Sequence, residues 1–263
     1  MTSLVLTPGQ LPRRLEALRW THDVRVRGVL DDGPAVAIVG ARAATQLGMD
    51  RAHALAKHLA RGGYRIVSGG ALGIDGAAHR GALAGGGTTT VVMGSGLARP
   101  YPARHRPLFD QVLAAGGALV SMLADDVMPR PGTFVQRNPL IAALADTVIV
   151  VEADINSGSL HTARAATRLG RMLAAWPGSR GCDRLLAAGA ALIEDERDAE
   201  LIAAGTPRQR SAPALDPMAA RVLAAMHAGA FSVDAICAST GLAVRDVLRA
   251  LPSIESSFLA RKQ

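Results

Sequence analysis

The sequence predicts an α/β fold: a Rossmann-like, doubly wound, mainly parallel sheet followed by a small C-terminal helical, winged-helix-like module. Short apolar runs alternate with segments whose apolar residues repeat at helical spacing, as in strand–helix–strand units. Two of these runs, Val36–Val39 and Tyr64–Val67, stop abruptly at glycine or at serine and glycine, which is typical of a buried parallel strand that turns into a helix. A stretch containing proline and arginine then precedes three short helical segments.

The first strand–helix–strand unit follows a region of mixed polarity. That region contains one or two helical turns at 11–18 and an alternating segment, Val24–Gly28, typical of an edge strand. After the first core strand, Thr45 is placed to cap a helix that runs to about Arg61. The next two residues are glycines, which end the helix before the second strand begins.

The same alternation continues to about residue 193. Further strands are expected at 89–93, 118–120, 147–151, 172–175 and 190–193. Further helices are expected from Asp75 to about 83 and at 107–115, 138–144 and 185–188, and a loop followed by a helix is expected within 157–170. Because parallel strands end at the same edge of a sheet, the polar loops that follow them are expected to gather there.

Composition divides the chain into four parts. We expect an N-terminal extension (1–34), a Rossmann-like domain (35–204), a linker (205–212) and a winged-helix-like module (213–263). The three helices of the last part are expected at 217–227, 232–239 and 244–251. Their helix–turn–helix rhythm is a weak signal, since short helices with glycine turns are common.

The charge of the chain favours a polyanionic partner. Its net charge is +7, and Lys57 and Lys262 are its only lysines, so the excess is almost all arginine. The alternative explanation of this charge is a GC-rich genome, which raises the share of arginine, alanine and glycine without any polyanionic partner. Aromatic residues make up only 3% of the chain, which argues against an extended base-stacking platform. No run is long enough for a membrane helix and no signal peptide is evident, so we expect a cytoplasmic protein with no membrane contact.

Neither cysteines nor known nucleotide motifs point to a cofactor. Cys182 and Cys237 stand far apart without the spacing of a metal site, so no metal is expected. The turn after the first strand carries Gly40 and Arg42 but lacks the further glycines and the acid of a dinucleotide fingerprint. The Gly-Lys-Ser/Thr sequence of a P-loop is absent. Backbone N–H groups at such a turn bind anions, and Arg42 is placed to clamp a phosphate.

A second glycine-rich turn runs from Ser68 through Gly69 and Gly70 to Asp75. Its glycines allow the backbone to approach a ligand closely. Asp75 and His79 lie four residues apart on one helix face. They form an acid–base pair or a lid on the pocket, or, more simply, Asp75 caps the helix and His79 packs below it.

Two later loops carry further polar residues. Arg137 and Asn138 are placed to bind phosphate and a base edge, and Asn138 also suits a helix N-cap. Ser157, Gly158, Ser159 and Thr162 make another anion-friendly helix start. A serine hydrolase is disfavoured, because the Gly-x-Ser-x-Gly elbow is absent and no third catalytic partner is evident.

Taken together, these stretches resemble the motifs of the DNA-processing protein A family, called DprA or Smf. The matching stretches, in chain order, are Gly40-Ala41-Arg42, Ser68 to Asp75 with Ala78-His79, Gly94 to Pro102, Phe134 with Arg137-Asn138, Glu152-Ala153 with Ser157 to Ala163, and Pro177-Gly178. Similar motifs cover residues 11–202 in unbroken order. The chain departs from the family pattern at Pro139, where the second arginine of Arg-Asn-Arg is expected, and at Met122, where glutamate is usual.

The resemblance implies a single-stranded DNA-binding recombination mediator that loads the RecA recombinase on incoming DNA during natural transformation. It also implies a homodimer, and we expect neither an enzyme nor a cofactor. The residues expected to bind nucleic acid are Gly40, Arg42, Ser68, Gly69, Gly70, Arg137, Asn138, Ser157, Gly158, Ser159 and Thr162.

The alternative is a nucleotide-binding or nucleotide-processing protein of the related Rossmann-like superfamily. Cytokinin-activating phosphoribohydrolases resemble this fold but carry Pro-Gly-Gly-x-Gly-Thr-x-x-Glu. The nearest stretch here, Pro131-Gly132-Thr133, has no glutamate to follow.

Overall fold

The computed structural model describes residues 3–206, 216–230 and 232–261. The chain divides into two compact units, Met1–Arg208 and Gln209–Gln263. Most of the linker expected at 205–212 lies outside the described residues. No helix among the described residues combines the length and the apolar character that a bilayer span requires.

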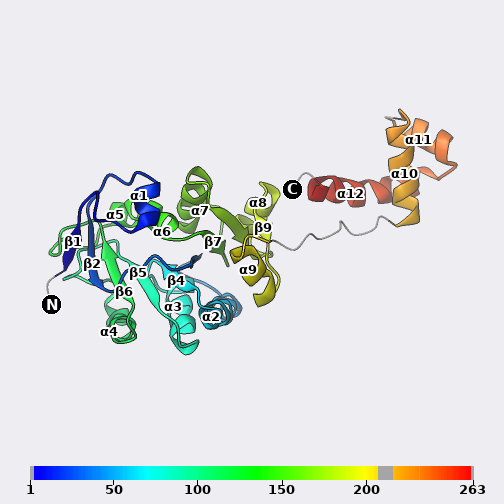
Figure 1. Ribbon diagram of the computed structural model, residues 1–263. Helices are drawn as coiled ribbons and strands as arrows, with labels where there is room; N and C mark the ends of the chain where they lie inside the picture. Colours follow the sequence, from blue (N-terminus) through cyan, green and yellow to red (C-terminus); the bar gives the residue numbers. More distant parts are fainter. Residues whose placement is uncertain (1–2, 207–215, 231, 262–263) are drawn as a thin grey trace. The chain divides into compact units, whose positions relative to one another are not determined.

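The first unit is built on one sheet, which has nine strands within the described residues (Figure 1). The strands are β1 (Leu4–Leu6), β2 (Val24–Gly28), β3 (Ala35–Val39), β4 (Arg65–Ser68), β5 (Thr89–Val92), β6 (Ala118–Ser121), β7 (Thr147–Val150), β8 (Met172–Ala175) and β9 (Ala191–Leu192). Their order is β1-β2-β6-β5-β4-β3-β7-β8-β9, and all pairs from β6 to β9 are parallel. The predicted α/β class is therefore confirmed.

The edge-strand prediction for Val24–Gly28 is wrong. This segment is β2, which pairs antiparallel with β6 on one side and with β1 on the other. Val24 and Val26 are buried while Arg25 and Arg27 are only half-buried. The alternation of buried and half-buried residues therefore shows that one side of the strand faces the core. Such an alternation occurs in central and in edge strands of antiparallel pairs, so it does not indicate the position of a strand in the sheet.

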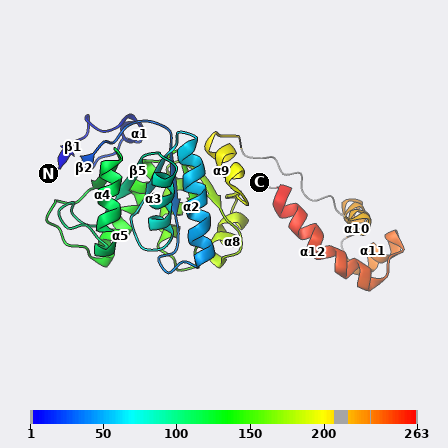
Figure 2. The same cartoon turned by 90° about the horizontal axis from the view of Figure 1, so that it is seen from below.

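Helices cover both faces of the sheet, as the doubly wound arrangement requires (Figure 1). Figure 2 shows the sheet from one of these faces, with helices in front of the strands. The helices are α1 (Arg13–Ala17), α2 (Gln46–Arg61), α3 (Ile74–Ala84), α4 (Arg106–Ala114), α5 (Pro131–Gln136), α6 (Asn138–Ala143), α7 (Ser159–Arg168), α8 (Arg180–Ala187) and α9 (Glu196–Ala203). Strand residues such as Ile38 and Ile66 face α2, α3 and α9. Their neighbours Val39 and Val67 face α1, α6, α7 and α8, which explains why the strands are apolar throughout.

Three helices differ from the predicted pattern. α5 begins at Pro131 in a stretch expected to be a loop, because proline fits the first turn of a helix, where its missing N–H is not needed. α8 begins five residues before the predicted position 185. α9 was not expected; its N-cap is Asp195, whose carboxylate accepts from the Asp198 N–H at 2.8 Å.

The second unit consists of α10 (Pro217–His227), α11 (Val233–Thr240) and α12 (Val244–Arg261). Its own apolar core includes Val222, Ile236 and Val247. Gly241, with φ +70°, ends α11 in the left-handed conformation that glycine tolerates. α12 continues past the predicted end at 251 and through Pro252, because the buried Ile254 belongs to the same core.

Candidate functional site

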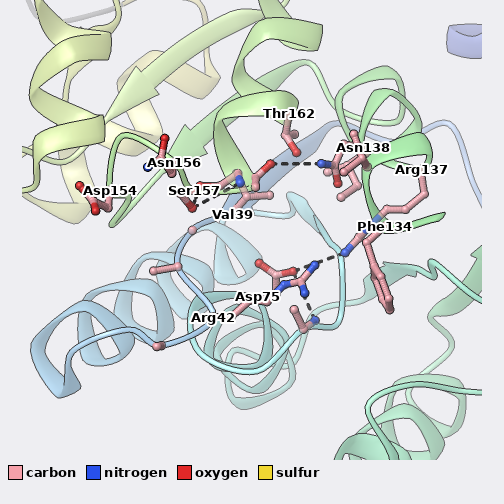
Figure 3. Close-up of a pocket in the computed structure, with 18 residues that line it drawn as sticks. Val39, Arg42, Asp75, Phe134, Arg137, Asn138, Asp154, Asn156, Ser157 and Thr162 are labelled. Carbon is pink, nitrogen blue, oxygen red and sulfur yellow. Dashed lines mark hydrogen bonds and ion pairs between the residues drawn. The ribbon is translucent and has the colours of Figure 1, made fainter. Parts of the chain in front are cut away.

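A cavity of about 550 Å³ opens at the carboxyl ends of β3 and β7 (Figure 3). The chain leaves β3 toward β4, β5 and β6, and then returns to place β7 on the other side of β3. The connections after β3 and β7 consequently cover opposite faces, and a crevice forms between them. Its walls come from the turn after β3, the loop after β7, the start of α7 and the α5–α6 segment.

Most of the predicted site residues meet at this cavity. Those that line it are Gly40, Arg42, Arg137, Asn138, Ser157, Gly158, Ser159 and Thr162. Three others, Ser68, Gly69 and Gly70, are buried and do not line it. The hydroxyl of Ser68 donates to the Ile38 carbonyl at 2.6 Å, so it ties β4 to β3.

The two buried glycines make room for the protein's own side chains. A Cβ atom on Gly69 would lie 1.9 Å from Nη1 of Arg137. One on Gly70 would lie 2.6 Å from a methyl group of Val91, and Gly70 also has φ +70°. In this structure a guanidinium and a core side chain fill the space beside these glycines, and their contact with a ligand stays a prediction.

Arg137 and Asp75 form a buried charged pair beneath the cavity. In Figure 3 the Arg137 side chain extends toward Asp75, and its Nη2 lies 4.0 Å from the carboxylate. Nη1 donates to the Val92 carbonyl at 2.7 Å, and the residue is only 4% exposed. Burial lowers the pKa of Arg137 to about 10 and raises that of Asp75, while each charge opposes the shift of the other. Arg137 thus fixes β5 to the cavity wall and adds positive potential there.

The structure decides between the two interpretations of Asp75 and His79. Asp75 accepts from the Ala71 N–H at 3.3 Å and lines the cavity. His79 is fully buried, does not line the cavity, and contacts the Thr89 hydroxyl through Nδ1 at 2.7 Å. Burial lowers the pKa of His79 to about 3, so its ring is neutral. The acid–base pair is therefore not assembled, and His79 is a packed core histidine. The helix cap predicted at Asp75 is wrong, because Gly73 is the N-cap of α3 and Asp75 lies within the helix.

Arg42 is the exposed cation of the cavity. Its guanidinium carbon lies 4.9 Å from the centre of the Phe134 ring, within the range of a cation–π contact. Phe134 in turn lies 5.5 Å, centre to centre, from Tyr101, which is 47% exposed. In the sequence, Phe134 and Tyr101 belong to two separate motifs, and nothing there predicts that their rings lie together. Their proximity depends on packing α5 against the loop after β5, which no local pattern shows.

Glu152 occupies the N-terminus of α2. Its carboxylate accepts from the Thr45 N–H at 3.0 Å and from the Thr45 hydroxyl at 2.6 Å. Its carbonyl accepts from the Ala41 N–H at 2.7 Å. Two N–H groups near the turn after Gly40 are therefore engaged by Glu152, whereas Arg42 stays exposed at the cavity, so the anion site predicted for this turn can involve its side chain.

The N-terminus of α7 remains available to the cavity. Gly158 is its N-cap, and Ser159 is its first residue. The hydroxyls of Ser157 and Ser159 lie 2.8 Å apart, and the Asn138 amide donates to the Gly158 carbonyl at 3.2 Å. The helix start therefore presents hydroxyl groups and the positive end of a helix dipole to the cavity. Within the described residues, no group of three or more His, Cys, Asp or Glu is arranged to hold a metal ion.

Comparison with known proteins identifies the family. The family described as DNA recombination-mediator protein A matches residues 26–203, which include the whole cavity. The chain belongs to this family. The DprA winged helix domain matches residues 206–255, so the C-terminal unit is of the predicted type. The resemblance to DprA and Smf proteins is confirmed.

Relatives and solved structures agree with this assignment. A relative from Mycobacterium tuberculosis that carries the DprA name is 40% identical over 241 residues, which cover 86% of this chain and 62% of the relative. The chain thus spans less than two thirds of that protein. DNA processing protein A from Streptococcus pneumoniae has a similar structure (TM-score 0.69, 33% identity, 76% of this chain and 74% of that one). The Helicobacter pylori protein is also similar (TM-score 0.69, 32% identity, 78% and 97%), and its structure is described as showing a single-stranded DNA binding mode.

Proposed function

We propose that this chain binds single-stranded DNA in the cavity between the ends of β3 and β7. The observation that carries the proposal is the pairing of two anion-binding features on that cavity. Arg42 presents an exposed guanidinium beside Phe134, and the N-terminus of α7 presents its dipole and two serine hydroxyls. The single-stranded DNA binding described for the Helicobacter pylori relative supports the same ligand.

The chemistry of the cavity suits a DNA backbone without sequence readout. Arginine binds phosphate through two parallel hydrogen bonds, and hydroxyl and backbone N–H groups add further donors. The Phe134 and Tyr101 rings offer a small apolar surface for a base, in contrast to the extended platform that the low aromatic content excludes. Of the predicted contacts, the buried Gly69 supports the cavity by making room for Arg137, while Ser68 and Gly70 pack within the sheet and its core.

In the cell, we assign the chain the role of a cytoplasmic recombination mediator. It would load RecA on incoming single-stranded DNA during natural transformation and would act as a homodimer. No catalytic role is proposed, because Asp75 is engaged with Arg137 and no described histidine lines the cavity beside Ser157 or Ser159. Faster assembly of RecA filaments on oligo-dT in the presence of the protein would test the RecA step.

The alternative, a nucleotide-binding protein, is disfavoured by Glu152. Dinucleotide sites of doubly wound folds place the pyrophosphate at the N-terminus of the first helix after the first strand. Here that position corresponds to α2, whose N-cap residue Thr45 donates both its N–H and its hydroxyl to the Glu152 carboxylate. A nucleotide phosphate would meet a negative charge there.

Fluorescence anisotropy with labelled oligo-dT tests the proposal. The Arg42→Ala variant is expected to bind at least about tenfold more weakly, with the slope of log affinity against log salt reduced by about 0.7, the value for one lost contact to single-stranded phosphate. Arg61→Ala is the matched control, since Arg61 is exposed at the far end of the 16-residue helix α2. Equal affinities for Arg42→Ala and the control would overturn the proposal, as would a wild-type protein that shows no binding at low salt.

A further inference from the structure

A second cavity, of about 640 Å³, lies beside the first. It is lined by Val135, Pro139, His161, Arg164, Thr167 and Arg168. Val135 also lines the first cavity, so the two are neighbours across the α5–α6 segment. Helix α7 contributes to both: its N-terminus borders the first cavity, and its later turns form the wall of the second. We call the second cavity the α7 groove.

The charged wall of this groove follows from helix geometry. His161, Arg164 and Arg168 are spaced three and four residues apart, so they form one stripe along α7. All three are exposed, and Nη2 of Arg164 lies 3.2 Å from Nδ1 of His161. Among the described residues, no carboxylate lies within 4.0 Å of either arginine.

Other arginines of the same unit are engaged in the fold. Arg65 pairs with Asp31 at 2.9 Å, and Arg14 pairs with Asp146 at 3.1 Å. The guanidiniums of Arg164 and Arg168 have no such carboxylate partner in the described structure, and they face a hollow surface large enough for a ligand. This combination distinguishes them from arginines that support the sheet.

We propose that the α7 groove binds the phosphates of the DNA strand as it leaves the first cavity, with Arg164 and Arg168 contacting successive phosphates. This inference rests on the proposed function and extends its site. Cβ atoms four residues apart on a helix are about 5–6 Å apart, so two long side chains reach neighbouring phosphates of an extended strand. Val135 and Pro139 supply an apolar opposite wall, which suits a sugar or the face of a base and reads no sequence.

The two cavities together predict a dependence on strand length. A short oligo-dT of about four nucleotides fills the first cavity alone, whereas one of about sixteen also occupies the groove; these lengths span the usual site sizes of single-strand binders. The Arg164→Ala/Arg168→Ala double variant is expected to bind the long strand about tenfold more weakly, with its salt slope reduced by about 1.4. Its affinity for the short strand is expected to stay within about twofold of wild type.

A double variant of equal charge provides the control. Arg61→Ala/Arg80→Ala removes two exposed arginines from α2 and α3, on the opposite face of the sheet. It is expected to bind both strands as the wild type does, and Arg164→Lys/Arg168→Lys is expected to recover most of the long-strand affinity. If the α7 variant and the control weaken long-strand binding equally, the groove proposal is wrong while the first cavity stands. If Arg42→Ala binds both oligo-dT strands as tightly as the wild type does, the proposed function itself is wrong.

Discussion

Replacing Gly69 by alanine tests whether Arg137 is held in place by the fold. The new methyl group would lie within 1.9–2.3 Å of three guanidinium atoms, so the guanidinium must leave its position. It would lose its 2.7 Å hydrogen bond to the Val92 carbonyl and its proximity to Asp75, both in a buried setting. A hydrogen bond from a charged group contributes about 1.5–3 kcal/mol, and separating a buried pair destabilises by about 3–5 kcal/mol. Because the 4.0 Å separation is long for an ion pair, we expect a loss of about 2–4 kcal/mol in the free energy of unfolding.

Gly158 provides the matched control for this substitution. It also borders the cavity, but no atom lies within 4 Å of a Cβ placed on it, and its φ of −60° suits alanine. Gly158→Ala should therefore change the free energy of unfolding by less than about 1 kcal/mol while its methyl group obstructs ligand binding at the start of α7. Urea unfolding followed by circular dichroism measures the first effect, and oligo-dT anisotropy measures the second. An unchanged urea midpoint for Gly69→Ala, or equal destabilisation by both variants, would refute the account of Arg137.

Two further predictions concern buried and capping groups. The pKa of His79 falls from 6.5 to about 3 on folding, so the folded protein disfavours protonation of this ring. The contribution of His79 to the free energy of unfolding should therefore be complete above pH 6.5. It should decline as the pH falls toward 3, by up to about 1.4 kcal/mol per pH unit. His79→Asn should remove that part of the slope in urea unfolding series, and an identical pH profile would contradict the assignment. Glu152→Ala should vacate the α2 N-terminus, so that pyrophosphate raises the melting temperature of the variant more than that of wild type, which keeps only the proposed phosphate site at Arg42. Thr45→Ala, which keeps the carboxylate, is the control. Equal responses of the two variants would show that the carboxylate does not exclude phosphate.

The core of the sheet could be predicted because its strands are buried on both faces. Runs such as Val36–Val39 are apolar without alternation and end at glycine, and both features are local. The position of β2 inside the sheet could not be predicted, since pairing with β6 is a long-range choice that leaves no mark on Val24–Gly28 itself. Helix α5 was not predicted, because it begins with Pro131-Gly132 and this pair of residues is equally typical of a loop.

The candidate site was predictable where chain topology alone decides it. Loops that follow neighbouring parallel strands meet at one edge, and this brought Arg42 and Ser157 together at one cavity. The roles of Gly69 and Glu152 could not be predicted. A glycine beside a strand end accommodates a ligand or a side chain equally well, and here it accommodates Arg137. A helix N-terminus accepts any anion, and only the folded structure shows that Glu152 supplies it.

The antiparallel strand β2 also constrains the order in which the protein can form during synthesis. Its partner is β6, in which Ser121 pairs with Arg25. During synthesis, β2 therefore leaves the ribosome long before β6 has been made. Until then, Val24 and Val26 have no partner strand on that side, and the nascent chain carries an open β edge. β2 can therefore pair with β6 only after the parallel strands β3, β4 and β5, which lie between them in the chain, have been made.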